Sequence, residues 1–303
     1  MKKPAVRIAA YIFACLVFPF IITVIMSGKE NGKGSAGKTA WLAVNDDKSA
    51  DKNTDVNDYV TGTVAAYYRD GDSPEFLKVM AVIARTYAAY VKGDGTMMDS
   101  GKLSMTTLTA GEMCSIWGAS YESNYAVVSQ AVKDTENIII TCDGKPVLPY
   151  FHSLSAGWTR EGDGKYLNKV ACIDDTNEPD YVTIVDFQTQ NLKKILQKSI
   201  ADVSFDDSVE NSFQIISRDS SGYVEEVMVG SRTVTGSQLC EILGLSSAAF
   251  SINVSDDLVV FTVKGNGSGY GVSLSMARKK AQEGATYKEI LDFFYKDIKI
   301  ESE

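Results

Sequence analysis

Histidine is almost absent from this chain of 303 residues, in which His152 is the only one. A zinc site built on two histidines, such as H-E-x-x-H, is therefore excluded, and any Ser-His or Cys-His pair has to use His152. Basic residues are also in deficit, with 30 lysines and arginines against 39 acids and a formal net charge of −9. A nucleic acid is for this reason not an expected partner. The 45% hydrophobic and 23% charged composition is that of a globular protein.

Cysteines are few, and none of them forms a C-x-x-C motif. Cys15 lies in an apolar N-terminal segment, and the other four are Cys114, Cys142, Cys172 and Cys240. These four allow up to two disulfides in three different pairings. The chain is long enough to bury a core without such staples, so free cysteines are also compatible with it. A thiol redox protein is disfavoured, because it needs a C-x-x-C motif or a thiol in a basic pocket.

Acidic residues are missing from the first 26 positions, which contain the bases Lys2, Lys3 and Arg7. Residues 8–26 then form an uncharged, mostly apolar run that would span roughly 28 Å as a helix, about the thickness of a bilayer core. The N-terminal bases predict that residues 1–7 are cytoplasmic and that the rest of the chain lies outside the cell membrane. We therefore expect a single-pass membrane protein with an extracytoplasmic C-terminal domain.

A cleaved signal peptide is the alternative interpretation of this apolar segment. Such a peptide ends in a small-x-small cleavage site, whereas bulky residues precede Ser27 here. The sequence therefore favours an uncleaved transmembrane anchor over residues 8–26. Residues 27–56 are rich in Gly, Ser, Lys, Asp and Asn, which is typical of a flexible linker, and the folded domain is expected over 57–303.

The folded part mixes helix and strand patterns. Ser73 and Pro74 form a helix start, apolar residues then recur at helical spacing, and Gly93 is a natural stop. Asp143-Gly144 lies between two apolar runs and predicts a hairpin turn. By the same reasoning we expect helices over 124–134, 235–245, 273–284 and 286–298, and strands over 138–142, 146–151, 213–218, 223–230 and 257–265. This pattern indicates an α+β fold of mixed helices and antiparallel hairpins, preceded by one transmembrane helix.

Four glycines alternate with other residues immediately before the helix expected over 273–284. The spacing of Gly265, Gly267, Gly269 and Gly271 lacks the lysine and the serine or threonine of a Walker loop. A dinucleotide fingerprint also requires a βαβ unit and an acid about 20 residues later. The glycines instead predict a tight turn with positive φ angles or a close approach of two backbones.

The single histidine begins a Ser/Gly-rich turn, residues 152–157, that follows a predicted strand. A lone histidine is either a structural residue or a group that faces a cleft, and the sequence leaves both readings open. A zinc site would need Cys142 or Cys172 as a partner, and neither has a short ligand spacing to His152. We therefore expect no metal site and no cofactor.

Four segments, in this order, carry a resemblance to a known family. They are DYVTGTVAAYYRDGDSPEFLKVMAVIARTYAAY from residue 58, KPVLPYFHSLSAGWTREGDGKYLNKV from 145, VTGSQLCEILGLSSAAFSI from 234 and GSGYGVSLSMARKKAQEGATYKEILDFFYKDIKI from 267. Together they resemble the SpoIID/LytB family and cover essentially the whole domain that follows the linker. An N-terminal membrane anchor is also typical of this family.

The resemblance implies an action on the glycan strands of peptidoglycan. Members of the family are lytic transglycosylases that cut such strands during engulfment of the forespore in sporulation. Their chemistry needs one carboxylic acid that protonates the glycosidic oxygen, followed by attack of the sugar's own 6-hydroxyl. The partners implied for this chain are glycan strands and other membrane proteins of the engulfment machinery.

The sequence departs from the family at the catalytic position. The family glutamate lies five residues after a glycine that corresponds to Gly62, and the same spacing reaches Tyr67 here. A phenol has a reference pKa near ~10 and cannot readily replace a carboxylic acid as a proton donor. Asp70 and Glu161 are the carboxylates that we consider as catalytic stand-ins.

Other polar positions of the family are altered as well, because Met80, Cys240, Ser268 and Leu274 replace a glutamine, an arginine, a histidine and a glutamine. The framework is kept at Gly62, Arg85, Thr86, His152, Ser153, Ser155, Gly157, Gly267, Gly269, Gly271, Ser273 and Tyr287. The resemblance places substrate binding at Arg85, His152, Ser153, Ser155, Gly267, Ser268, Gly269 and Ser273. Two hypotheses follow: a transglycosylase with a relocated acid, and an inactive glycan-binding or scaffold protein.

Overall fold

The computed structural model describes residues 55–93, 103–205, 210–255 and 257–303. The expected cytoplasmic tail, the transmembrane anchor over 8–26 and nearly all of the linker lie outside these residues. Among the helices that are described, none combines the length and the apolar character needed to cross a membrane. The anchor and its membrane placement therefore stay predictions.

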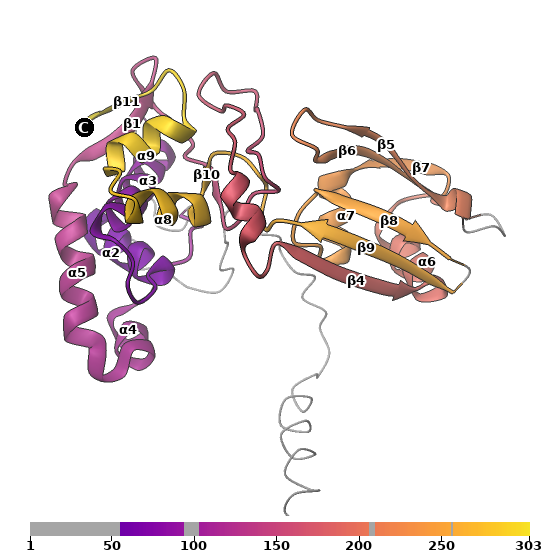
Figure 1. The fold of residues 1–303 in the computed structure, drawn as a ribbon, viewed down its shortest axis with the longest axis horizontal. Helices are drawn as coiled ribbons and strands as arrows, with labels where there is room; N and C mark the ends of the chain where they lie inside the picture. Colours follow the sequence, from indigo (N-terminus) through magenta and orange to yellow (C-terminus); the bar gives the residue numbers. More distant parts are fainter. Residues whose placement is uncertain (1–54, 94–102, 206–209, 256) are drawn as a thin grey trace, which may run out of the picture. The chain divides into compact units, whose positions relative to one another are not determined.

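A first hydrophobic core is built mainly by helices from the two ends of the described chain (Figure 1). They are α2 (Val56–Tyr67), α3 (Pro74–Lys92), α4 (Ala110–Trp117), α5 (Tyr121–Asp134), α8 (Leu274–Gln282) and α9 (Tyr287–Phe294). Helix α3 is the central element, and its side chains from Phe76 to Ala89 are almost all buried. Its ends confirm the prediction, since the Ser73 hydroxyl accepts from the Glu75 amide and Gly93 ends the helix with a φ of +54°.

An antiparallel sheet joins this core in the strand order β11 (Lys299–Ser302), β1 (Ile138–Cys142) and β2 (Lys145–Pro146). The predicted turn is confirmed, with positive φ angles of 52° at Asp143 and 74° at Gly144. The return strand expected over 146–151 is only partly formed. Pro146 and Pro149 have no amide hydrogen for a strand ladder, so the chain leaves the sheet after β2. It forms a new strand at β3 (Phe151–His152), which pairs in parallel with β10 (Val272–Ser273).

A second core consists of two three-stranded antiparallel sheets and two helices. One sheet has the order β4 (Val182–Gln188), β9 (Leu258–Lys264) and β8 (Phe250–Val254), and the other has β5 (Phe213–Arg218), β6 (Val224–Val229) and β7 (Arg232–Thr235). The helices of this core are α6 (Thr189–Ser199) and α7 (Gly236–Leu243). Elsewhere along the described chain, short 3-10 turns occur at Gly118–Ser120, Ile173–Asn177 and Glu210–Ser212. The expected hairpin of β5 and β6 is confirmed, as is strand β9.

The described part of the chain is thus an α+β structure, as predicted. Elements β4 and α6 were not expected, because the sequence analysis found no pattern between residues 173 and 212. The four cysteines that the structure describes are all free, so of the alternatives that the sequence left open the structure has unpaired thiols.

Candidate functional site

The glycine loop, residues 265–271, lies directly against the histidine turn, residues 152–157. Leu154 and Asn266 exchange two backbone hydrogen bonds of 3.0 and 2.7 Å between N and O atoms. All four glycines of the loop have positive φ angles. A Cβ atom built on Gly267 would lie 2.6 Å from the Cβ of His152, and one on Gly271 would overlap the carbonyl oxygen of Tyr150. The prediction of a tight turn with a close backbone approach is confirmed on both counts.

His152 is 2% exposed and lies under this loop. Its Nδ1 is 3.0 Å from the carbonyl oxygen of Tyr270, which can only accept, so Nδ1 carries the proton and Nε2 does not. Burial lowers the pKa of the imidazole to about 4, although the Tyr270 carbonyl and the nearby Asp175 carboxylate both favour the charged form. The ring is therefore neutral at physiological pH, and its primary role in the described structure is to join the turn to the loop.

Asp175 is a buried carboxylate that the sequence analysis did not single out. Its Oδ2 accepts hydrogen bonds from the Ser155 amide at 2.9 Å and from the Ser273 hydroxyl at 2.7 Å. Ser273 in turn caps helix α8, since its Oγ accepts from the Met276 amide. Asp175 thus fixes the histidine turn to the start of α8. No sequence signal marks it, because an acid in a polar stretch is usually solvent-exposed.

Tyr67 lies at the C-terminal end of α2 beside the strand that carries His152. Its ring packs edge-to-face on Phe151, with 5.3 Å between centroids and 88° between planes. Burial raises the pKa of the phenol, and the neighbouring Thr106 side chain partly offsets this rise. Its carbonyl oxygen accepts from Nη2 of Arg278, whose Nε also pairs with Asp72 at 2.9 Å. Tyr67, the altered family position, therefore lies next to the histidine turn. Its backbone carbonyl is bound by the arginine of the Arg278–Asp72 ion pair.

The two expected stand-ins lie in different surroundings. Asp70 is exposed just after α2, where its Oδ1 accepts from Nδ2 of Asn124 at 3.4 Å. Glu161 is exposed four residues after the histidine turn, in the lining of a cleft. The structure does not bring Asp70 and Glu161 into one cluster, so either acid would act separately.

Arg85 lies in the contact between α3 and α5. Arg85 is only 3% exposed, and its guanidinium donates to the carbonyl oxygens of Thr135 at 2.6 Å and Val132 at 3.3 Å. These are carbonyls at the end of α5, where a guanidinium satisfies groups without a helical partner. The described contacts of Arg85 are thus structural, and its role in substrate binding stays a prediction.

The remaining predicted binding residues gather around the histidine turn and the glycine loop. Ser155 and Ser273 are fully buried, and Ser268 is 3% exposed with its Oγ accepting from the Tyr270 amide. Ser153 is exposed. The structure therefore brings these residues together, but most of their polar atoms are used within the fold, and their role in substrate binding stays a prediction.

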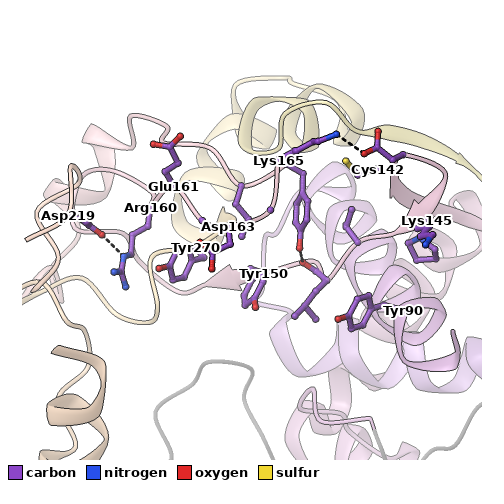
Figure 2. Close-up of a pocket in the computed structure, with 18 of the residues that line it drawn as sticks. Tyr90, Cys142, Lys145, Tyr150, Arg160, Glu161, Asp163, Lys165, Asp219 and Tyr270 are labelled. Carbon is purple, nitrogen blue, oxygen red and sulfur yellow. Dashed lines mark hydrogen bonds and ion pairs between the residues drawn. The ribbon is translucent and has the colours of Figure 1, made fainter. Parts of the chain in front are cut away.

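A cleft of about 750 Å³ opens on one side of this assembly (Figure 2). Its lining contains both tyrosine rings and charged groups: Tyr90, Lys145, Tyr150, Arg160, Glu161, Asp163, Lys165, Tyr166, Asp219 and Tyr270. Tyr67 is not part of this lining. Tyr150 lines the cleft while the next residue, Phe151, packs against Tyr67, and successive side chains of an extended segment point in opposite directions. The cleft and the ring of Tyr67 therefore lie on opposite sides of this segment.

Arg160 organises the floor of the cleft. Its Nε donates to Oδ2 of Asp219 at 2.6 Å, and its guanidinium lies over the rings of Tyr270 and Tyr223 at 4.6 and 5.0 Å from their centroids. Its own amide donates to the carbonyl oxygen of Gly269. The arginine is 7% exposed, so a desolvated cation is balanced by one carboxylate and two aromatic faces. No sequence pattern marks this cluster, because Asp219 belongs to a hairpin 59 residues away.

The other altered family positions are also buried. Met80 and Leu274 lie in the first core, and Cys240 lies in the second, where burial raises the pKa of its thiol to about 12. Neutral or apolar side chains thus occupy places where the resemblance implied polar groups.

Comparison with known proteins agrees with this reading of the sequence. Residues 45–142 match the family described as SpoIID, stage II sporulation protein. The chain is 27% identical over 264 residues to stage II sporulation protein D of Bacillus subtilis, covering 82% of this chain and 75% of the relative. It is 26% identical over 263 residues to the protein of that name from Bacillus amyloliquefaciens, with the same coverage. These matches support the resemblance to the SpoIID family, to which the chain is similar over most of its length but at low identity.

Proposed function

We propose that this protein acts in sporulation by binding peptidoglycan glycan strands in the tyrosine-lined cleft, without cleaving them through position 67. Similarity to the SpoIID family supports the sporulation role. The choice of glycan rests on what the resemblance of the four sequence segments implies. The single observation that carries the proposal is that the cleft is lined by several tyrosine rings together with charged groups of both signs.

This lining suits a polymer of sugar rings. A tyrosine offers an apolar face for the C–H side of a sugar and a hydroxyl for its polar edge. In the same lining, Lys145 and Lys165 provide donors and Glu161 and Asp163 provide acceptors for sugar hydroxyl and acetamido groups. Because both signs of charge are present, the cleft is not built for a polyanion.

Loss of the proton donor is the reason to propose binding rather than cleavage. The glycosidic oxygen has to be protonated by a carboxylic acid before the 6-hydroxyl attacks C1 and the bond to the leaving sugar breaks. Tyr67 is a weaker acid than a carboxyl group from the start, and its burial raises the pKa of the phenol further. Its ring also faces away from the cleft, on the other side of Phe151.

A lytic transglycosylase with a relocated acid is the second candidate. The observation in its favour is that Glu161 and Asp163 line the cleft as exposed carboxylates. In that mechanism the carboxylic acid of Glu161 would protonate the glycosidic oxygen as the bond from C1 to the leaving sugar breaks. The 6-hydroxyl would then bond to C1 and return its proton to the Glu161 carboxylate, which gives the 1,6-anhydro ring. Asp70 is less suited to this role, because it lies outside the cleft and is engaged with Asn124.

The place of action belongs to the same proposal. An anchor over residues 8–26 would hold the protein in the cell membrane with its domain on the outer side, where peptidoglycan is found. Other membrane proteins of the engulfment machinery would then be its neighbours. The acidic balance of the chain fits this setting and disfavours nucleic acid.

Sedimentation of the full chain with purified glycan strands tests the binding site. We expect Tyr90→Ala to weaken binding by about tenfold, since this ring lines the cleft and loses its contact with sugar. Tyr125→Ala on α5 is the matched control, because that tyrosine is 38% exposed, close to the 47% of Tyr90, but lies outside the cleft. Equal binding by Tyr90→Ala and the unchanged protein would overturn the assignment of the cleft.

A further inference from the structure

Strand β4 is an open edge of the second core. All seven of its residues pair with β9 in one uninterrupted antiparallel register, from Val182 opposite Lys264 to Gln188 opposite Leu258. No strand of the described chain pairs with its other side. Figure 1 shows β4 at the edge of its sheet, so within the described residues no strand pairs with its outward amide and carbonyl groups.

The usual protections of an edge strand are missing from β4. Its sequence, VTIVDFQ, contains no lysine and no proline, and its pairing contains no bulge. Val182 and Ile184 are 47% and 67% exposed, and they point to the same side of the sheet. Val185 and Phe187 point to the opposite side, where they pack on the second core. The strand thus combines β-branched residues, an exposed apolar pair and a single charge, Asp186.

The other edges of this core are protected in ways that β4 is not. Strand β5 also exposes an isoleucine, Ile216 at 51%, but its register shifts on either side of Ser217. On β8, the carbonyl oxygen of Phe250 accepts from Nη2 of Arg218 at 2.8 Å. Strand β7 is protected by its shortness, since it has only four residues against the seven of β4. Strand β5 is the most useful comparison for an experiment, because its exposed Ile216 lies on an edge where the irregular register hinders pairing with a further strand.

We propose that β4 is the contact through which two copies of this chain pair, strand against strand, across a twofold axis. A twofold axis makes identical strands antiparallel, which matches the direction in which β4 already pairs with β9. In a register centred on Ile184, each exposed side chain meets one from the same face of the other copy. Ile184 then lies opposite its counterpart, and Asp186 lies opposite Val182 rather than opposite another carboxylate.

This pairing would join the two β4-β9-β8 sheets into one continuous sheet. The occupant is a second copy because antiparallel self-pairing brings the exposed apolar side chains of β4 together and keeps the two Asp186 carboxylates from facing each other. None of the residues lining the tyrosine cleft lies on β4, so the pairing does not depend on glycan binding. The two proposals can therefore fail separately.

Light scattering of the full chain in detergent, compared among three variants, tests the proposal. The unchanged protein is expected to have the mass of two 32.9 kDa chains. Ile184→Lys should reduce the mass twofold, because each copy would place a charge opposite its twin. Ile216→Lys adds the same charge at a similarly exposed isoleucine and should leave the dimer intact.

A cross-linking experiment fixes the geometry. With Cys114 and Cys142 replaced by serine, Ile184→Cys should form a disulfide-linked dimer on mild oxidation, whereas Ile216→Cys should not. A monomeric unchanged protein would overturn the proposal, and so would a dimer that survives Ile184→Lys. Protection of the β4 amides only when a peptide or another protein is added would also overturn it, since the edge would then serve a different partner.

Discussion

Alanine at Gly271 is expected to lower the free energy of unfolding by roughly 3–4 kcal/mol, one of the two largest effects that the structure predicts. Gly271 has a φ of +69° and approaches the backbone of Tyr150 so closely that a Cβ atom would overlap its carbonyl oxygen. The loop and the histidine turn would have to separate, which would also displace Tyr150 from the cleft. Urea unfolding of the full chain, followed by tryptophan fluorescence, measures the change.

Gly244 provides a matched control for this substitution. It has nearly the same φ, +68°, but a Cβ atom there would meet nothing within 4 Å. Gly244→Ala should therefore cost only the left-handed backbone strain, about 1 kcal/mol. If the two variants lost the same stability, positive φ alone would explain the glycine at 271, and the close approach would carry no energetic weight.

Acidification is expected to destabilise the protein by about 3 kcal/mol between pH 7 and pH 4 through His152 alone. Burial lowers the pKa of this imidazole from 6.5 to about 4 in the folded chain. Between those two values the unfolded chain binds the proton and the folded chain does not. The contribution of neutral His152 to the free energy of unfolding is therefore fully present above pH 6.5 and is lost as the pH falls toward 4. Denaturant unfolding at a series of pH values measures it.

The chain offers a clean control, because His152 is its only histidine. His152→Asn keeps a donor near the position of Nδ1 for the Tyr270 carbonyl and removes the titrating group. Its stability should change little between pH 7 and pH 5, where the unchanged protein already loses stability. An equal slope in both proteins over this interval would show that His152 is not the group responsible.

Local signals predicted much of the fold. The ends of α3 followed from Ser73, Pro74 and Gly93, and the β1–β2 turn followed from Asp143-Gly144, since capping and turn chemistry act within a few residues. Strand β4 was not predicted, because it lies at a sheet edge and exposes apolar residues on its outer side, so its sequence does not alternate clearly. Helix α6, which follows β4 directly, was not predicted either. The break after β2 depends on Pro146 and Pro149, which lack the amide hydrogen that a strand ladder needs.

The candidate site could be predicted only in its local parts. The glycine loop and the histidine turn were recognised separately as turns, and the structure shows that they are two halves of one assembly. Asp175, by contrast, is recruited over 98 residues to Ser273, and Arg160 over 59 residues to Asp219. Such long-range partners leave no spacing in the sequence, so buried ion pairs and hydrogen bonds of this kind appear only in the folded chain.

The central claim is that Tyr67 leaves this SpoIID-like protein able to hold glycan but unable to cut it through that position. Product analysis tests the claim most directly. The full chain and an active family member are each incubated with glycan strands stripped of stem peptides, and soluble products are identified by mass spectrometry. We predict that the full chain sediments with the strands and releases no 1,6-anhydro sugars, while the active relative releases them. Release of anhydro sugars by the full chain, abolished in Glu161→Gln, would contradict the claim and establish a relocated acid.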